Sequence, residues 1–307
     1  MVVWLASLAV SIVAADRALH SGARLAREQT VAATAIVAAT DDAATQLSAS
    51  DLRVTVDGYP AAITSLEPFT GTTAIGVLID VSASMWMDNE AKSYRRALDA
   101  HADRLLQIGH GSLTLAAFAS AVHVQPVITD RPSFLAATSA LFDVPDVETH
   151  GPSIVWDALD GLLTTIDGRA DEGVVVLITD GAASGNLRSS DEVMRRARAL
   201  GIRVFVIAEG PEAHVLASAQ ARGQHPVTAA VNLQRLATVT GGTFLVDGLK
   251  DTWNRPRPEP FIDAILDVLA RRSLVRFTWP AGVSPDAGVE ITSGVPTETI
   301  AYAYRKR

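Results

Sequence analysis

Cysteine is absent from the sequence of 307 residues. Without it there is no disulfide framework, no thiolate zinc site and no thiol nucleophile. The seven histidines are scattered and lack the i, i+4 spacing by which a helix presents two histidines to zinc. The Gly-x-Ser-x-Gly nucleophile motif and the glycine-rich phosphate-binding motifs are absent as well. A net charge of −8 argues against a nucleic-acid-binding surface, which normally carries a basic patch.

Long apolar runs are also scarce, and one stands at the N-terminus. Residues 2–15 are apolar apart from Ser7 and Ser11, which is too short to span a bilayer comfortably. Small residues precede Asp16, as at a signal-peptide cleavage site, although no lysine or arginine stands before the run. We therefore predict a signal peptide at residues 1–15 and export to the periplasm or the cell exterior. A misassigned start, an uncleaved anchor or a buried helix are the alternatives. Nothing after residue 15 is long and apolar enough to predict a membrane-spanning helix.

The composition is ordinary for a globular protein, with 48% hydrophobic and 20% charged residues. From residue 72 onward, strand-like runs alternate with helix-like stretches, which predicts repeated βα units and a mostly parallel sheet. Residues 112–118 and 121–127 are too close for a crossover, so we expect them to pair antiparallel, with Pro126 on an edge strand. The predicted fold class is α/β, a doubly wound, mostly parallel sheet with one antiparallel edge strand. The expected helices are residues 89–106 (with Asp88 as N-cap), 132–141, 154–166, 191–200, 232–239 and 260–271, and the further strands are residues 174–179, 202–208 and 243–246.

The main functional signal is the stretch Ile75-Gly-Val-Leu-Ile-Asp80-Val-Ser82-Ala-Ser84. An apolar run of this length, followed by helix-like residues, predicts a strand that is buried on both faces and ends at Asp80. Open α/β sheets bind their ligands at the carboxyl ends of strands. Asp80, Ser82 and Ser84 can turn three oxygens inward from one loop, and Mg²⁺ and Ca²⁺ choose oxygen ligands. For this stretch taken alone, an ordinary polar turn after a strand is the alternative.

Later stretches extend the pattern. Residues 174–179 run into Asp180-Gly181, and Ser153 lies four residues before Asp157. In this order the Asp-x-Ser-x-Ser, Ser-x-x-x-Asp and Thr-Asp-Gly segments resemble the von Willebrand factor type A domain, of the bacterial secreted type. The resemblance implies a Rossmann-like fold and a metal-ion-dependent adhesion site (MIDAS). It also implies that Ser153 replaces the family's threonine, which keeps the hydroxyl and loses only the methyl group that restricts χ1.

The resemblance implies that the metal ligands are Asp80, Ser82, Ser84, Ser153 and Asp180. All are hard oxygen donors, which favours Mg²⁺, with Mn²⁺ or Ca²⁺ as alternatives, over zinc. In the family the metal binds an acidic group of a partner, so we expect a protein-binding module and no enzyme. The alternative is a metal-dependent hydrolase of the phosphatase type that uses Asp80. We also expect Asp80 to lie over a largely solvated site.

Both flanks of the α/β region contain runs of residues that favour β-strands. Residues 29–68 contain Asp57-Gly58, a hairpin-turn signal, and residues 61–66 are expected to form the returning strand. Residues 272–307 carry further strand-like runs. We predict that the two flanks form a small β-rich domain beside a von Willebrand factor type A domain at residues 72–271. The alternatives are a hairpin packed on the edge of the main sheet and a tail that extends that sheet.

Overall fold

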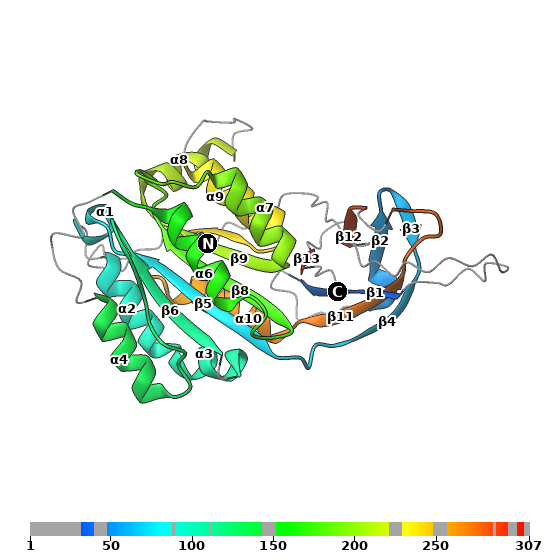
Figure 1. The fold of residues 1–307 in the computed structure, drawn as a ribbon, viewed down its shortest axis with the longest axis horizontal. Helices are drawn as coiled ribbons and strands as arrows, with labels where there is room; N and C mark the ends of the chain where they lie inside the picture. The colour runs from blue at the N-terminus through cyan, green and yellow to red at the C-terminus, as the bar shows by residue number, and fades with distance from the viewer. Residues whose placement is uncertain are drawn as a thin grey trace, which may run out of the picture.

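The computed structural model describes residues 32–39, 48–87, 90–110, 112–142, 152–220, 229–247, 257–284, 287–293 and 300–303. They form an α/β body around a six-stranded sheet, with two smaller β-sheets beside it (Figure 1). The predicted signal peptide at residues 1–15 lies outside the described residues. None of the helices in these ranges is long and apolar enough to cross a membrane.

The six-stranded sheet has the strand order β10-β9-β8-β5-β6-β7. Its strands are β5 (Thr73–Asp80), β6 (Leu113–Phe118), β7 (Val122–Val124), β8 (Glu172–Thr179), β9 (Ile202–Ala208) and β10 (Phe244–Val246). Neighbouring strands are parallel except β6 and β7, which pair antiparallel at the edge. β5 and β8 are buried at every position, because helices cover both faces of the sheet. The predicted fold class and its antiparallel edge strand are confirmed, but the strand ends at Val124, so the prediction that Pro126 lies on it is wrong.

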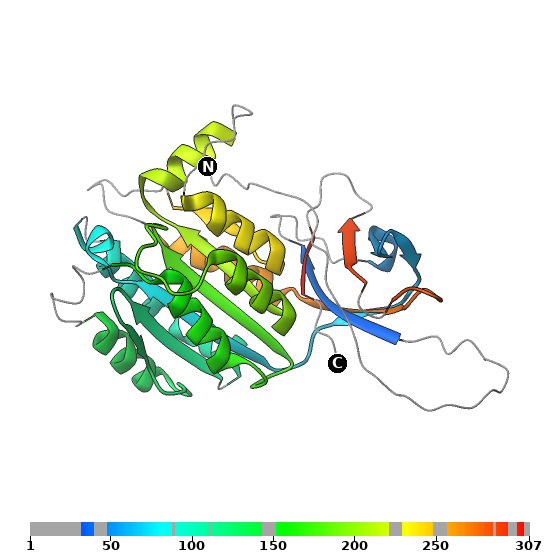
Figure 2. The ribbon, with the colours of Figure 1, turned by 45° about the horizontal axis from the view of Figure 1, so that its top comes forward.

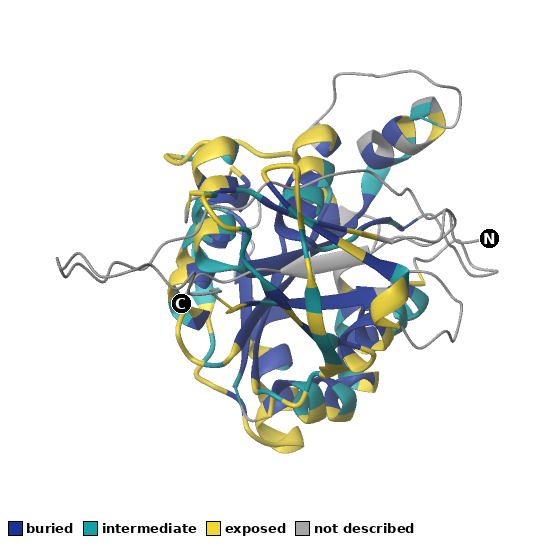
Figure 3. Cartoon of the chain, turned by 90° about the vertical axis from the view of Figure 1, so that its right-hand side faces the viewer, coloured by how far each residue is buried: buried dark blue, intermediate teal, exposed yellow. Residues whose placement is uncertain are grey.

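Helices pack on both faces of this sheet, and Figure 2 shows α6, α7 and α9 side by side on one of them. One face is covered by α2 (Glu90–Ala100), α3 (Ala102–Gly109), α4 (Arg131–Phe142) and α10 (Glu259–Ala270), and the other by α6 (Val155–Ile166), α7 (Ser190–Leu200), α8 (Gly210–Gln220) and α9 (Ala229–Thr240). Side chains of β5 alternate between the two cores, with Val77 and Ile79 in the first and Leu78 in the second. Buried residues line the middle of the body, and exposed residues cover the outer sides of the helices (Figure 3).

The two smaller sheets are built from both flanks of the chain. β1 (Ala32–Ala39) pairs with β11 (Ser273–Thr278) and β13 (Ile300–Ala303), and β4 (Ile63–Pro68) pairs with the other edge of β11. β2 (Leu52–Val56) pairs with β3 (Tyr59–Ala61) and β12 (Val289–Ser293). Val37, Val54 and Phe277 contribute to one core that strands from both flanks share. The flanks therefore add β-sheets beside the body, while the domain boundaries at residues 72 and 271 stay a prediction.

The predicted single helix at residues 89–106 is wrong. The structure has two helices, α2 and α3, which are separated at His101. The His101 ring is buried, and its Nε2 lies 3.0 Å from a carboxylate oxygen of Asp263 on α10. This break therefore accompanies a tertiary contact that no local pattern reports. A further short helix, α1 (Ala83–Met87), precedes α2, and the expected N-cap residue Asp88 lies outside the described residues.

The returning strand of the N-terminal hairpin also differs from the expected residues 61–66. β3 ends at Ala61, and the chain then crosses into the other small sheet as β4. Long-range pairing determines this switch, since the N–H of Thr278 donates to the carbonyl of Ala62 at 2.9 Å and Phe277 pairs with Ile63.

A buried charge cluster lies where the body meets the small sheets. Arg272 donates to Thr73 Oγ1 at 2.8 Å and forms an ion pair with Glu172, which also pairs with Arg203. The guanidinium of Arg272 lies over the ring of Phe69, 4.8 Å from its centroid. One buried carboxylate thus holds two guanidinium groups at the edge where the strands of the main sheet begin.

Candidate metal centre

Asp80 is the last residue of β5 and the centre of the site. The N–H of Ser82 donates to Asp80 Oδ1 at 2.9 Å, which turns the chain immediately after the strand. Two hydroxyls donate to Oδ2, that of Thr179 at 2.7 Å and that of Ser153 at 3.2 Å. Asp80 is completely buried, and Ser82 and Ser153 are buried as well, so the expectation of a largely solvated site is wrong. The cause is that segments after β5 and β8 and before α6 close around the carboxylate.

The two serines after Asp80 lie side by side. α1 begins at Ala83, and this helical turn brings the Oγ atoms of Ser82 and Ser84 within 3.2 Å of each other. Ser82 is buried and Ser84 is exposed, so the pair leads from the interior to the surface. The loop therefore presents the hydroxyl pair that the spacing of the two serines predicts.

Ser153 approaches from a different part of the chain. It is buried and stands two residues before the first residue of α6. The N–H of Ile154 donates to the carbonyl of Ala119, which anchors this segment to the end of β6. The hydroxyl of Ser153 is thereby held against Asp80, as the resemblance to the family implies.

Asp180 follows β8 and is half-buried. Its Oδ1 accepts a 2.9 Å hydrogen bond from the N–H of Ala182, and the intervening Gly181 has φ +81°, a conformation that favours glycine. No hydrogen bond joins Asp180 to the other predicted ligands among the described residues. Asp180 directly follows Thr179, whose hydroxyl contacts Asp80, so the two aspartates lie at the ends of neighbouring strands.

Burial, together with the charge of Asp180, raises the pKa of Asp80 to about 6, while hydrogen bonds from Ser82 and Thr179 partly oppose this rise. A positive ion beside Asp80 would offset both causes of the raised pKa. The donors at the site are carboxylate and hydroxyl oxygens, which suit a hard divalent cation such as Mg²⁺. In the described parts of the chain, no group of three or more histidine, aspartate or glutamate side chains could hold a metal ion. Three of the five predicted ligands at this site are serine hydroxyls.

The structure brings Asp80, Ser82, Ser84 and Ser153 together, and Asp180 follows Thr179 at the end of the neighbouring strand. Sequence reasoning missed Thr179 as a contact of Asp80. The sequence did contain a signal for this contact. Asp80 and Thr179 each end an apolar strand, so aligning the ends of these two neighbouring strands places the two residues opposite each other.

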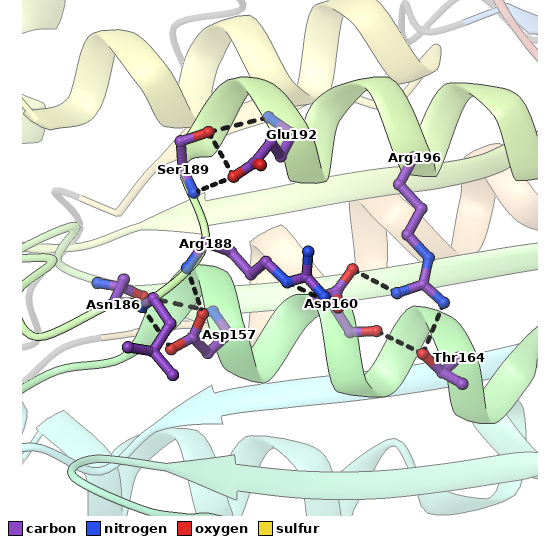
Figure 4. Close-up of polar contacts among 9 residues, drawn as sticks. Asp157, Asp160, Thr164, Asn186, Arg188, Ser189, Glu192 and Arg196 are labelled. Atoms are coloured by element: carbon purple, nitrogen blue, oxygen red, sulfur yellow. Dashed lines mark hydrogen bonds and ion pairs between the residues drawn. The ribbon is translucent and has the colours of Figure 1, made fainter.

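Sequence reasoning also missed how the loop after β8 is fixed, which Figure 4 shows. Asp157 of α6 accepts hydrogen bonds from the N–H groups of Leu187 and Arg188, both at 2.8 Å. Asn186 accepts from the N–H of Trp156 at 2.8 Å and donates to the carbonyl of Ser153 at 3.3 Å. We call these reciprocal contacts of Asp157 and Asn186 the latch. The latch holds the loop that contains Asp180 against the segment that contains Ser153.

Fold and site together define an α/β domain with a cluster of oxygen donors at the carboxyl edge of a parallel sheet. A sequence model of the von Willebrand factor type A domain matches residues 74–240, just over half of the chain. The chain therefore belongs to the von Willebrand factor type A domain family, which confirms the predicted family. The matched region contains each of the predicted metal ligands.

Several solved structures resemble the chain at low sequence identity. A von Willebrand factor type A protein from Catenulispora acidiphila is 12% identical and aligns with 92% of this chain and 76% of its own, with a TM-score of 0.47. An aerotolerance-related membrane protein from Bacteroides fragilis is 15% identical over 64% of this chain and 98% of its own, with a TM-score of 0.45. Proximal thread matrix protein 1 from the mussel byssus, described with a zinc-occupied MIDAS motif, is 16% identical over 66% of this chain and 47% of its own, with a TM-score of 0.45. This chain thus spans about half the length of the mussel protein. No curated protein sequence matches the chain.

Proposed function

We propose that the protein is a metal-ion-dependent module that binds another protein. The observation that carries this proposal is the convergence of the hydroxyls of Ser153 and Thr179, from two separate segments, on the buried carboxylate of Asp80. Oxygen donors from three loops thereby meet at the edge where α/β sheets bind ligands. The proposed ligands of the cation, Mg²⁺ with Mn²⁺ or Ca²⁺ as alternatives, are Asp80, Ser82, Ser84, Ser153 and Asp180.

The charge balance of the site supports an acidic partner. Asp80 and Asp180 are the two carboxylates of the proposed ligand set, so the protein's own negative charge at most neutralises a divalent cation. A cation held in this way keeps coordination positions that are filled by exchangeable water, and a carboxylate oxygen of a partner can replace one of these waters. We therefore propose a protein partner that presents an aspartate or glutamate side chain.

Metal-assisted hydrolysis is the weaker hypothesis. A nucleophilic carboxylate needs an oxygen that is free to reach the substrate, but Asp80 is buried and both of its oxygens accept hydrogen bonds. Arg188, a candidate for binding phosphate, directs its Nε to Asp160 Oδ2 at 3.7 Å (Figure 4). Hydrolysis of phosphate esters in Mg²⁺ or Mn²⁺ by the wild type, with loss in Asp80→Asn, would reverse this ranking.

Thermal unfolding with and without Mg²⁺ tests the metal site. A ligand that binds only the folded state stabilises it by RT ln(1 + [L]/Kd), about 2.7 kcal/mol at a hundredfold excess over Kd. We expect this gain in the wild type and in Asp191→Asn, a control that removes an exposed carboxylate in the first turn of α7, and no gain in Asp80→Asn. Equal Mg²⁺-induced shifts in the wild type and Asp80→Asn would place the metal elsewhere.

A pull-down from the native cell envelope tests the protein partner. The proteins retained in Mg²⁺ should be lost both in EDTA and with Asp80→Asn as bait. Retention of the same proteins under all three conditions would contradict a metal-dependent module.

From residues 1–15 alone we also propose that the protein is exported. Cell fractionation should then recover the chain outside the cytosol. Recovery of the full-length, uncleaved chain in the cytosol would contradict export.

A further inference from the structure

Leu187 is the most exposed large apolar side chain among the described residues. Its exposed fraction is 93%, and the next highest, that of Tyr59, is 61%. Single exposed leucines are common on protein surfaces, so exposure alone assigns no role. Leu187 differs from other exposed apolar residues in its position and in its backbone, which is fixed by hydrogen bonds.

The backbone at Leu187 is fixed although its side chain is in solvent. Its own N–H donates to Asp157 Oδ2, and the N–H of the following Arg188 donates to Asp157 Oδ1, each at 2.8 Å. The preceding Asn186 is bound at both ends of its amide, to the N–H of Trp156 and to the carbonyl of Ser153. The latch thus presents Leu187 on a pre-ordered loop, where a binding partner loses little free energy to ordering.

Leu187 is connected to the proposed metal site through its neighbour in the chain. It directly follows Asn186, whose side-chain amide donates to the carbonyl of Ser153 at 3.3 Å, and consecutive Cα atoms lie about 3.8 Å apart. The loop between Asp180 and Leu187 exposes Ala182, Ala183, Ser184 and Gly185. These residues are small and uncharged, so they leave room for a partner and add no competing charge.

We propose that Leu187 is the apolar specificity contact of the metal-dependent site, and that the site binds a protein segment in which an acidic residue lies near a large aliphatic or aromatic residue. This inference rests on the proposed function. The path from the carbonyl of Ser153 to the Cα of Leu187 runs over a 3.3 Å hydrogen bond, the Asn186 side chain and one Cα–Cα step, roughly 10 Å in all. An extended segment advances about 3.3 Å per residue, so the apolar residue is expected within about three positions of the acidic one. The acidic residue meets the metal site, and its apolar neighbour packs against Leu187.

Selection of a phage-displayed random peptide library on the full chain tests the proposal. In Mg²⁺ the wild type should enrich peptides that combine an aspartate or glutamate with a leucine, isoleucine, methionine or phenylalanine within three positions. Leu187→Ser should still enrich the acidic residue but not the apolar one. Val127→Ser, which changes an exposed aliphatic residue on the loop after β7, is the matched control and should select the same peptides as the wild type.

The enriched peptides then give affinities that separate this inference from the proposed function. We expect Leu187→Ser to bind them about tenfold or more weakly than the wild type, as loss of one buried leucine contact predicts. Its Mg²⁺-induced thermal shift should equal that of the wild type, which shows that fold and metal site are intact. Acidic peptides enriched without an apolar neighbour, or bound equally by Leu187→Ser, would overturn the role of Leu187 and leave the metal-dependent function standing. Absence of any Mg²⁺-dependent acidic peptide in the wild type would overturn both.

Discussion

The hydroxyl of Thr179 donates a 2.7 Å hydrogen bond to Oδ2 of Asp80 and accepts a 3.0 Å hydrogen bond from the N–H of Gly181. Because β5 and β8 are parallel and Ile79 lies opposite Ile178, the two residues end neighbouring strands at the same level. Thr179 therefore fixes one oxygen of the Asp80 carboxylate and the first turn of the loop after β8. It orients a proposed ligand without being one.

Thr179→Val tests this positioning role, because valine keeps the shape of threonine and removes the hydroxyl. Loss of a group that orients a metal ligand typically lowers metal affinity 10- to 100-fold, and we expect Mg²⁺ affinity to fall by about that factor. Isothermal titration calorimetry measures it. Thr165→Val, which removes a hydroxyl that donates to Gly161 on α6, should bind Mg²⁺ like the wild type. Unchanged affinity in Thr179→Val would show that Asp80 is positioned without it.

The metal-free protein should become more stable when the charge of Asp80 is removed. Burial and the neighbouring Asp180 raise the pKa of Asp80 to about 6. At pH 7 the group is ionised, and its charge in this buried position lowers the stability of the folded protein. Asparagine removes the charge and can keep an acceptor oxygen for the N–H of Ser82, but it then turns its amide NH2 group to the hydroxyls of Ser153 and Thr179, which lose their acceptor, and this loss offsets part of the gain. We expect Asp80→Asn to gain roughly 1 kcal/mol in urea denaturation with EDTA present. A less stable variant would show that the hydrogen bonds to the carboxylate outweigh its desolvation.

Removing the carboxylate of the buried charge cluster should cost far more stability than breaking an exposed ion pair, because it leaves buried charges unpaired. Glu172→Gln removes the carboxylate that pairs with both Arg203 and Arg272 and leaves two buried guanidinium groups without it. Breaking a buried pair from one side typically costs about 3–5 kcal/mol. Asp191→Asn breaks the exposed pair with Arg235, for which about 0–1 kcal/mol is expected. Urea denaturation of both variants makes the comparison, and equal losses would contradict the role of the buried cluster.

The N-terminus of α7 gives a pH-dependent prediction (Figure 4). The N–H and hydroxyl of Ser189 donate to the carboxylate of Glu192, each at 2.8 Å, and these hydrogen bonds lower the pKa of Glu192. A carboxyl group whose pKa is lower in the folded state adds stability above its unfolded pKa and loses it as the pH falls through the folded pKa. The wild type should therefore melt above Glu192→Gln at pH 7, and the difference should shrink from about pH 4 downwards. A difference that is equal at pH 7 and pH 3 would contradict this assignment.

Local patterns were sufficient for the features that adjacent residues encode. Asp80, Ser82 and Ser84 share one loop after a buried strand, so an apolar run followed by alternating oxygen donors predicts both the strand and the donors. Features that depend on distant residues were not predictable in this way. The break at His101 accompanies a contact with Asp263, and neither residue carries a local signal for it.

The same limit applies to the strand switch and the latch. β4 leaves the N-terminal hairpin because β11, more than two hundred residues later in the chain, supplies its partner. The latch joins α6 to a loop about thirty residues away in the sequence. Its donors are backbone N–H groups, which almost every residue carries, so the residue types at these positions give no signal for the contact. Spacing indicated Asp157 as part of the family pattern, but its contacts with Leu187 and Arg188 required the fold.

Asp157→Asn separates two roles for that carboxylate. In the structure it accepts hydrogen bonds from two backbone N–H groups, and asparagine retains one acceptor oxygen, so one of the N–H groups loses its partner. We expect hydrogen exchange at the amides of Leu187 and Arg188 to become about five- to tenfold faster, the change that corresponds to about 1 kcal/mol for one lost hydrogen bond. Mg²⁺ affinity should fall less than tenfold, because the proposed ligands are unchanged. Asp103→Asn on α3 removes an exposed carboxylate that pairs with Arg131, away from this loop, and should leave both amides unaffected. If Asp157→Asn instead abolished Mg²⁺ binding and left exchange at the two amides unchanged, Asp157 would be a ligand of the metal and the latch would not be what holds the loop.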